Sequence, residues 1–396
     1  MLSRSPAPAL PPVDPLATSR PDWDVFCKVI DNLGDIGVCW RLARQMTGEH
    51  ALRVRLWVDN LTSFRLLCPE VDPALSIQHR QGIEVRRWDG DFPRVDPARV
   101  VLETFACRIP ESFVEAMAKQ SPPPVWLNLD YLSAEDWVAG WHALPSPHPQ
   151  LPLIKYFFFP GFRHDTGGLL REGELRTRRQ NFLASADRQL ALWNDVGFPP
   201  PCGDALLVSL FAYENPAIGD LLSAWEASET PVCCAAPLSS TLPAMAAYAG
   251  QALTAGQSLR RGALELRILP FLQQDRYDQL LWLCRLNFVR GEDSFVRAQW
   301  AARPLVWQAY PQEDATHLRK LDAFLTLYGA SLPNTTGAVL RDFWQAWNKG
   351  SLAVTHWRDL AASLDSLDEH AHRWDAGLAE QDDLCTRLIR FSRSKL

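Results

Sequence analysis

Short apolar runs alternate with segments of helical spacing along most of this 396-residue chain, and the series starts again near the middle. Alternation of this kind indicates a mostly parallel sheet covered by helices. Several runs are almost continuously apolar, as expected of strands that are buried on both faces. The chain is also too long for one ordinary core. We therefore expect an α/β protein with two Rossmann-like domains that face each other across a cleft.

The pattern predicts the following elements. In the first half of the chain, strands are expected at Asp24–Ile30, Val54–Asp59, Ile83–Trp88, Val100–Phe105, Val125–Leu129 and Tyr156–Phe159. In the second half, strands are expected at Ala205–Tyr213, Val232–Ala236, Leu264–Leu269, Leu286–Val289 and Leu305–Gln308. Helices are predicted over Ile36–Met46, Glu111–Lys119 and Asn181–Asp195, and one long amphipathic helix from Asp375 to Leu396.

The turn-rich stretch Gly197–Gly203 suggests a joint between the domains. The predicted units are a disordered tail (1–21, rich in Pro, Ala and Ser), a first domain (22–196) and a second domain (197–374). The terminal helix (375–396) is expected to pack back on the first domain.

The formal net charge of −6 argues against nucleic acid as the main partner, because phosphate neutralisation supplies most of such affinity. No apolar run is long enough to suggest a membrane span, and the N-terminus lacks the apolar core of a signal peptide. The chain contains nine cysteines without a CxxC pair, which suggests free thiols in a reducing compartment. Only His370 and His372 approach a metal-pair spacing, so we expect no metal and a cytoplasmic location.

An acidic loop follows the first predicted strand. Asp31 closes that strand, Gly34 and Gly37 allow a tight turn, and Asp35 precedes the helix. Asp35 could be an N-cap and Asp31 a turn former. The loop does not fit GxGxxG, and two acids would repel a phosphate. Alternatively, the two carboxylates bind a cationic acceptor substrate, or one of them acts as a general base.

A second strand–loop–helix unit contains RGEDS, in which Asp293 or Ser294 could cap a helix beginning at Phe295. A diphosphate would be favourable at the free N–H groups of such a helix, with Arg290 as a cation and Gly291 allowing close approach. Glu292 would bind a sugar hydroxyl or reach toward the acceptor. Three aromatic residues at predicted strand ends could stack on a base: Phe211, Tyr213 and Phe271.

Several stretches between Trp23 and Gln312 resemble the elongation factor P arginine rhamnosyltransferases. They are KVIDNLGDIGVCWRLARQ, LETFACRIP, VWLNLDYLSAEDWV, PLIKYFFFPGF, LFAYEN, LPFLQQDRYDQLLW and NFVRGEDSFVRAQWAARPLVWQAYPQ. One departure is Arg285, where the family pattern leads us to expect an acid beside the nucleotide pocket.

The resemblance implies a metal-independent, inverting glycosyltransferase of the GT-B fold, which transfers rhamnose from dTDP-β-L-rhamnose to an arginine of elongation factor P. It places Asp31 and Asp35 on the family's catalytic acidic loop and Glu292 on its donor-binding side. We expect these three to form the catalytic group, with Asp35 as the base. The resemblance also places these residues on the donor-binding side: Phe211, Tyr213, Phe271, Arg290, Gly291, Asp293 and Ser294. The alternatives are a GT-B-like enzyme with another donor, an epimerase, or a non-catalytic protein that binds elongation factor P.

A guanidinium acceptor fits the acidic loop, because carboxylates hold guanidinium through paired hydrogen bonds. Prior deprotonation of the guanidinium by a carboxylate would cost about 11 kcal/mol, from a pKa mismatch of roughly 8. We therefore expect proton transfer to accompany C–N bond formation.

Overall fold

The computed structural model describes residues 20–31, 33–90, 92–201, 203–312 and 315–396. The predicted disordered tail therefore lies outside the described residues, except for its last two positions. At one of these, Arg20 donates a hydrogen bond from Nε to the carbonyl of Pro97 at 2.8 Å, so this residue is tied to the first domain.

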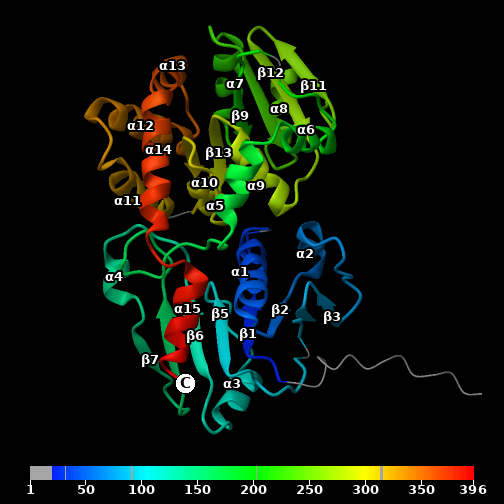
Figure 1. The fold of residues 1–396 in the computed structure, drawn as a ribbon, viewed down its shortest axis with the longest axis vertical. Helices are drawn as coiled ribbons and strands as arrows, with labels where there is room; N and C mark the ends of the chain where they lie inside the picture. Colours follow the sequence, from blue (N-terminus) through cyan, green and yellow to red (C-terminus); the bar gives the residue numbers. More distant parts are fainter. Residues whose placement is uncertain (1–19, 32, 91, 202, 313–314) are drawn as a thin grey trace, which may run out of the picture.

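Two α/β halves lie one above the other, with the C-terminus in the lower half (Figure 1). The lower half contains β1 (Trp23–Cys27), β2 (Val54–Val58), β3 (Ile77–Arg80), β4 (Ile83–Arg87), β5 (Val100–Thr104), β6 (Val125–Leu129), β7 (Pro145–Pro147) and β8 (Ile154–Phe158). Its helices are α1 (Gly34–His50), α2 (Leu61–Leu67), α3 (Glu111–Ala118) and α4 (Trp137–Trp141). The strand order is β3-β4-β2-β1-β5-β6-β8-β7, and only β3 and β7 pair antiparallel with their neighbours.

The upper half repeats this plan. Its strands are β9 (Leu206–Leu210), β10 (Val232–Pro237), β11 (Ser258–Arg261), β12 (Leu264–Leu269), β13 (Leu286–Arg290) and β14 (Leu305–Gln308). They form a sheet in the order β11-β12-β10-β9-β13-β14, in which β11 alone pairs antiparallel. Its helices are α5 (Leu175–Leu183), α6 (Ala186–Asp195), α7 (Ile218–Glu226), α8 (Leu242–Ala249), α9 (Gln274–Leu283), α10 (Asp293–Ala301), α11 (Thr316–Gly329), α12 (Asn334–Asn348), α13 (Val354–Ala362) and α14 (Leu364–Ala379).

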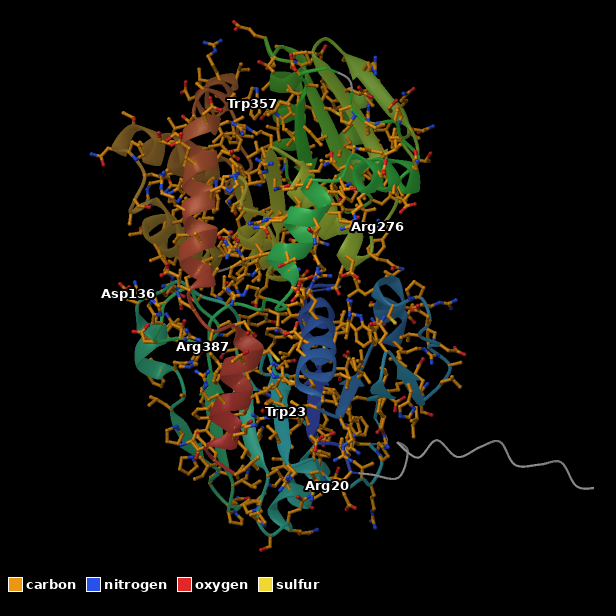
Figure 2. All side chains as sticks on the ribbon, viewed as in Figure 1. Arg20, Trp23, Asp136, Arg276, Trp357 and Arg387 are labelled. Carbon is orange, nitrogen blue, oxygen red and sulfur yellow. The ribbon has the colours of Figure 1, made fainter. Side chains whose placement is uncertain are left out.

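The central strands are buried on both faces, which explains their continuous apolar sequence. All five residues of β1 are buried, including Asp24, which bonds the buried Arg55 and the indole of Trp57. Trp23 in the lower half and Trp357 in the upper half, both labelled in Figure 2, are almost fully buried. Apolar side chains are buried against both sheets, in a main cluster that extends through the two halves. The predicted two-domain α/β architecture is confirmed.

The chain passes between the halves twice. Helices α5 and α6 pack against α9 of the upper half, so the first crossing lies before Leu175, upstream of the boundary predicted between residues 196 and 197. One helix was predicted over Asn181–Asp195. That prediction was wrong, because the Ser185 side chain accepts a hydrogen bond from the N–H of Arg188 and starts a new helix.

The prediction of one long helix from Asp375 to Leu396 was also wrong. Helix α14 ends at Ala379, and α15 (Leu384–Arg393) begins after Asp383, whose side chain caps it. Helix α15 packs against the lower half, as expected of the terminal segment (Figure 1). Arg387, labelled in Figure 2, fixes it there by donating to the carbonyl of His164 at 2.7 Å.

Eight of the nine cysteines lie among the described residues, and all eight are buried free thiols. Cys202 lies outside the described residues. Among the helices of the described chain, none is long and apolar enough to cross a membrane.

Candidate active site between the two domains

The acidic loop after β1 lies in the cleft between the halves. Asp35 is 2% exposed and belongs to the first turn of α1, whose N-cap is Leu33. Its Oδ2 accepts the backbone N–H groups of Ile30 (2.8 Å) and Asp31 (2.9 Å). The N-cap interpretation of Asp35 was therefore wrong, because its carboxylate folds back onto the loop that precedes the helix.

Asp31 reaches across the cleft. Its Oδ2 accepts a hydrogen bond from the Tyr213 hydroxyl at 2.7 Å, and its Oδ1 lies 3.6 Å from Nη1 of Arg290. The Arg290 guanidinium also lies over the rings of Phe211 and Tyr213, at 4.6 and 4.5 Å from their centroids. Tyr213, predicted to stack on a base, holds Asp31 through this hydrogen bond.

Glycine is required where the two loops meet. Gly291 has a φ of +60°, and a Cβ added there would lie 2.7 Å from the Tyr213 hydroxyl and 2.9 Å from Oδ2 of Asp31. A Cβ at Gly34 would lie 2.6 Å from the same Asp31 oxygen. Gly291 was predicted to allow close approach of the backbone, and here it allows the two loops to contact each other.

Helix α10 begins at Asp293, not at Phe295, and no side chain caps it within the described chain. Ser294 hydrogen-bonds the backbone of Arg290 instead. Asp293 accepts hydrogen bonds from Nε of Arg41 (2.9 Å) and Nε2 of Gln274 (3.0 Å). The capping predictions for Asp293 and Ser294 were therefore wrong, and the helix N-terminus faces the cleft without a side-chain cap.

A pocket enclosing about 620 Å³ of empty space lies on one side of this contact. It brings together most of the predicted donor-binding residues and adds others that the sequence did not single out, chiefly Gln274, Tyr277 and Arg41. Its lining comprises Asp31, Leu33, Gly34, Arg41, Leu67, Phe211, Pro237, Leu238, Phe271, Leu272, Gln274, Tyr277, Arg290, Glu292, Asp293 and Ser294.

A second pocket, enclosing about 940 Å³, lies on the other side. The two pockets share Asp31, Gly34 and Glu292. Asp35 lines only the second pocket, as do Phe105, Tyr131 and Lys320, which sequence reasoning missed. The cleft is therefore one space in two compartments, with carboxylates at the junction.

Glu292 connects the domains, since its Oε2 accepts the N–H of Leu132 at 2.9 Å. Burial raises the pKa of Glu292 to about 8, although the Leu132 hydrogen bond and the charge of Lys320 act against the rise. Burial likewise raises the pKa of Asp35, against the hydrogen bonds from the Asp31 and Ile30 backbone, and the Asp31 charge raises it further. Carboxyl groups in a cleft whose pKa is shifted by burial are typical of functional sites.

A buried ion network joins the domains beside the first pocket, which Arg41 also lines. Arg41 of α1 pairs with Asp278 of α9 through both terminal nitrogens (3.1 and 3.0 Å), and Arg297 of α10 pairs with the same carboxylate (3.0 and 2.7 Å). Glu172, in the crossing segment, accepts from Arg297 at 2.7 Å. Burial opposes ionisation of Glu172, but Arg297 and Arg41 lower its pKa to about 2. The network thus fixes α1 relative to α9 and α10.

The family pattern led us to expect Arg285 beside the nucleotide pocket, but it lies elsewhere. It pairs with Asp365 (2.5 Å) and Asp368 (2.9 Å) of α14. Among the described residues no group of three or more His, Cys, Asp or Glu side chains could hold a metal ion.

Two facing Rossmann-like domains with a divided cleft between them define a glycosyltransferase of the GT-B fold. The family model described as "Elongation-Factor P (EF-P) rhamnosyltransferase EarP" matches residues 23–393, and this chain belongs to that family.

Relatives support the assignment over almost the whole chain. A protein-arginine rhamnosyltransferase of Pseudomonas putida is 47% identical over 94% of this chain and 99% of its own length. One of Pseudomonas aeruginosa is 48% identical, over 93% and 98%. A solved structure from a study of EarP-mediated arginine glycosylation of translation elongation factor EF-P aligns with a TM-score of 0.67 and 35% identity, covering 94% of this chain and 99% of the other.

Proposed function

We propose that this protein transfers rhamnose from dTDP-β-L-rhamnose to one arginine side chain of elongation factor P, with inversion at the anomeric carbon. The observation that carries the proposal is the divided cleft, whose compartments meet at Asp31, Gly34 and Glu292. A donor in one compartment and an acceptor in the other would react at that junction. Elongation factor P is a cytoplasmic substrate in this proposal, and the enzyme needs neither nucleic acid nor a membrane.

The first compartment suits a sugar nucleotide. Phe211 and Phe271 line it, and a base that stacks on an aromatic ring gains about 1–3 kcal/mol. The uncapped N-terminus of α10 and the Arg290 guanidinium suit the diphosphate. Because both groups are already in place, they would stabilise the negative charge that develops on the leaving dTDP.

The second compartment suits a guanidinium. In the reaction a guanidinium nitrogen attacks C1 of rhamnose, the bond from C1 to the diphosphate oxygen breaks, and the nitrogen loses a proton. Oδ2 of Asp35 is occupied by two backbone N–H groups, which leaves Oδ1 to accept that proton. Burial raises the pKa of Asp35 and so makes it a stronger base.

Asp31 and Glu292 would orient the acceptor and stabilise positive charge on the sugar. With a pKa of about 8, Glu292 is mostly protonated near neutral pH. An arriving guanidinium favours the ionised form, so acceptor binding should release a proton from Glu292.

The test combines the enzyme, dTDP-β-L-rhamnose and unmodified elongation factor P, and follows the products by NMR. We expect dTDP and an α-linked rhamnosyl-arginine to appear together. A β-linked product would contradict inversion. A thermal-shift comparison of dTDP-, UDP- and GDP-sugars separates this function from a transferase with another donor or an epimerase. Binding of elongation factor P without dTDP release would instead favour a non-catalytic binding protein.

A further inference from the structure

The segment that follows β6 touches carboxyl groups from both domains. The Tyr131 hydroxyl lies 3.5 Å from Oδ1 of Asp35, and the next N–H, that of Leu132, donates to Oε2 of Glu292 at 2.9 Å. Asp35 belongs to the lower domain and Glu292 to the upper one. Two adjacent residues therefore relate the position of the expected base to that of the carboxyl group across the cleft.

A turn with a strained backbone packs against Tyr131. Phe105 follows β5 and has a φ of +53°, and its ring stacks on Tyr131 with centroids 4.6 Å apart and planes 22° from parallel. Ala106 and Arg108 also have left-handed backbones, with φ of +52° and +53°. Residues with side chains avoid this conformation, and clusters of them are found chiefly at functional sites.

The turn is held by groups that are themselves buried. The Phe105 N–H donates to the carbonyl of Leu129 at 2.7 Å. The Arg108 N–H donates to Oε1 of Glu103 at 3.0 Å, and Oε2 of Glu103 lies 2.7 Å from Nζ of Lys155. Because both ends of the turn are fixed, the Phe105 ring gives Tyr131 a defined place beside Asp35.

One oxygen of Asp35 is fixed by backbone N–H groups, and among the described residues the Tyr131 hydroxyl is the hydrogen-bond partner of the other. We propose that Tyr131, supported by Phe105, is a positioning residue that aims Oδ1 of Asp35 at the acceptor nitrogen while the adjacent Leu132 N–H holds Glu292. The inference rests on the proposed transfer reaction and deepens it. Such contacts are often long without substrate and shorten in the reactive complex.

The test is Tyr131→Phe, which removes the hydroxyl and keeps the stacked ring. We expect kcat to fall about tenfold, the effect of one lost hydrogen bond in the transition state. Affinity for dTDP-β-L-rhamnose, measured by calorimetry, should stay within about twofold, because Tyr131 does not line the donor-side pocket. The matched control is Tyr156→Phe, which removes the same atom from a ring that packs on Phe391 of α15, and should leave kcat unchanged.

A second readout is independent of turnover. The charged and titratable groups that face Asp35 are Asp31 on its own loop, Cys27 of β1, Tyr131 and Glu292. The Tyr131 hydroxyl lowers the pKa of Asp35, so Tyr131→Phe should raise it in an NMR titration of labelled carboxyl carbons. Phe105→Leu keeps the hydroxyl but removes the stacked ring, and should reduce kcat by a smaller factor.

Unchanged kcat and an unchanged Asp35 titration in Tyr131→Phe would overturn the inference. So would an equal loss of activity in Tyr156→Phe, since that would indicate a general effect of the missing hydroxyl on the fold. If the unaltered enzyme transfers nothing, the proposed function fails, whereas the Asp35 titration still decides whether Tyr131 positions this carboxyl.

Discussion

Glu292→Gln should stabilise the fold at alkaline pH while removing a carboxyl group from the active site. Burial raises the pKa of Glu292 from 4.5 to about 8, so the folded protein binds a proton over a pH range in which the unfolded chain has lost it. Glu292 therefore does not affect the free energy of unfolding below pH 4.5. Its destabilising contribution grows as the pH rises from 4.5 to 8 and is constant above that. The full penalty is about 5 kcal/mol.

The assay is chemical denaturation of both proteins at pH 5 and pH 8.5. The advantage of Glu292→Gln over the unaltered protein should grow by roughly 4 kcal/mol between these values, because glutamine never ionises. Glu111→Gln, on the exposed side of α3, controls for loss of one negative charge from the whole protein. An advantage that is the same at both pH values would refute the reasoning. Transfer by Glu292→Gln should also be slower by at least about tenfold.

Three further changes test other contacts. Gly291→Ala places a Cβ against the Tyr213 hydroxyl and Asp31, so it should reduce donor affinity in calorimetry and cost about 1–2 kcal/mol in backbone strain; unchanged affinity would contradict the contact. Arg41→Met removes a partner from two aspartates, one of them buried, and should lower the free energy of unfolding by about 3 kcal/mol; an unchanged midpoint in calorimetric melting would show that the network is not stabilising. Asp35→Asn keeps the shape but loses the charge, so turnover should fall at least about 100-fold with normal donor binding; normal turnover would rule Asp35 out as the base.

The sequence was most informative where both faces of a strand are buried. Val125–Leu129 was predicted with its observed bounds because five consecutive buried positions leave an almost unbroken apolar run. The antiparallel edge strands were missed: Ser258–Arg261 alternates exposed and partly buried residues, and Pro145–Pro147 is exposed throughout. Such edges are fixed by pairing with a neighbour, and a local pattern does not reveal that partner.

The candidate site also contains residues that the sequence revealed and residues that it did not. Asp31 and Asp35 could be found because they follow a strand in an unusual acidic loop. Tyr131 could not, because only the folded chain brings it beside Asp35. Asp293 was interpreted as a cap from its local sequence, but its carboxylate bonds Arg41, more than half the chain away. Contacts between domains therefore overrode local preferences at the positions that matter most to the proposed reaction.

The most direct test of the central claim is the intact mass of unmodified elongation factor P after incubation with this protein and dTDP-β-L-rhamnose. The account predicts a gain of one deoxyhexose, located by fragmentation on a single arginine, and no gain when the donor is left out. An unchanged mass, obtained with folded enzyme that binds the donor, would contradict the claim that the divided cleft transfers rhamnose to arginine.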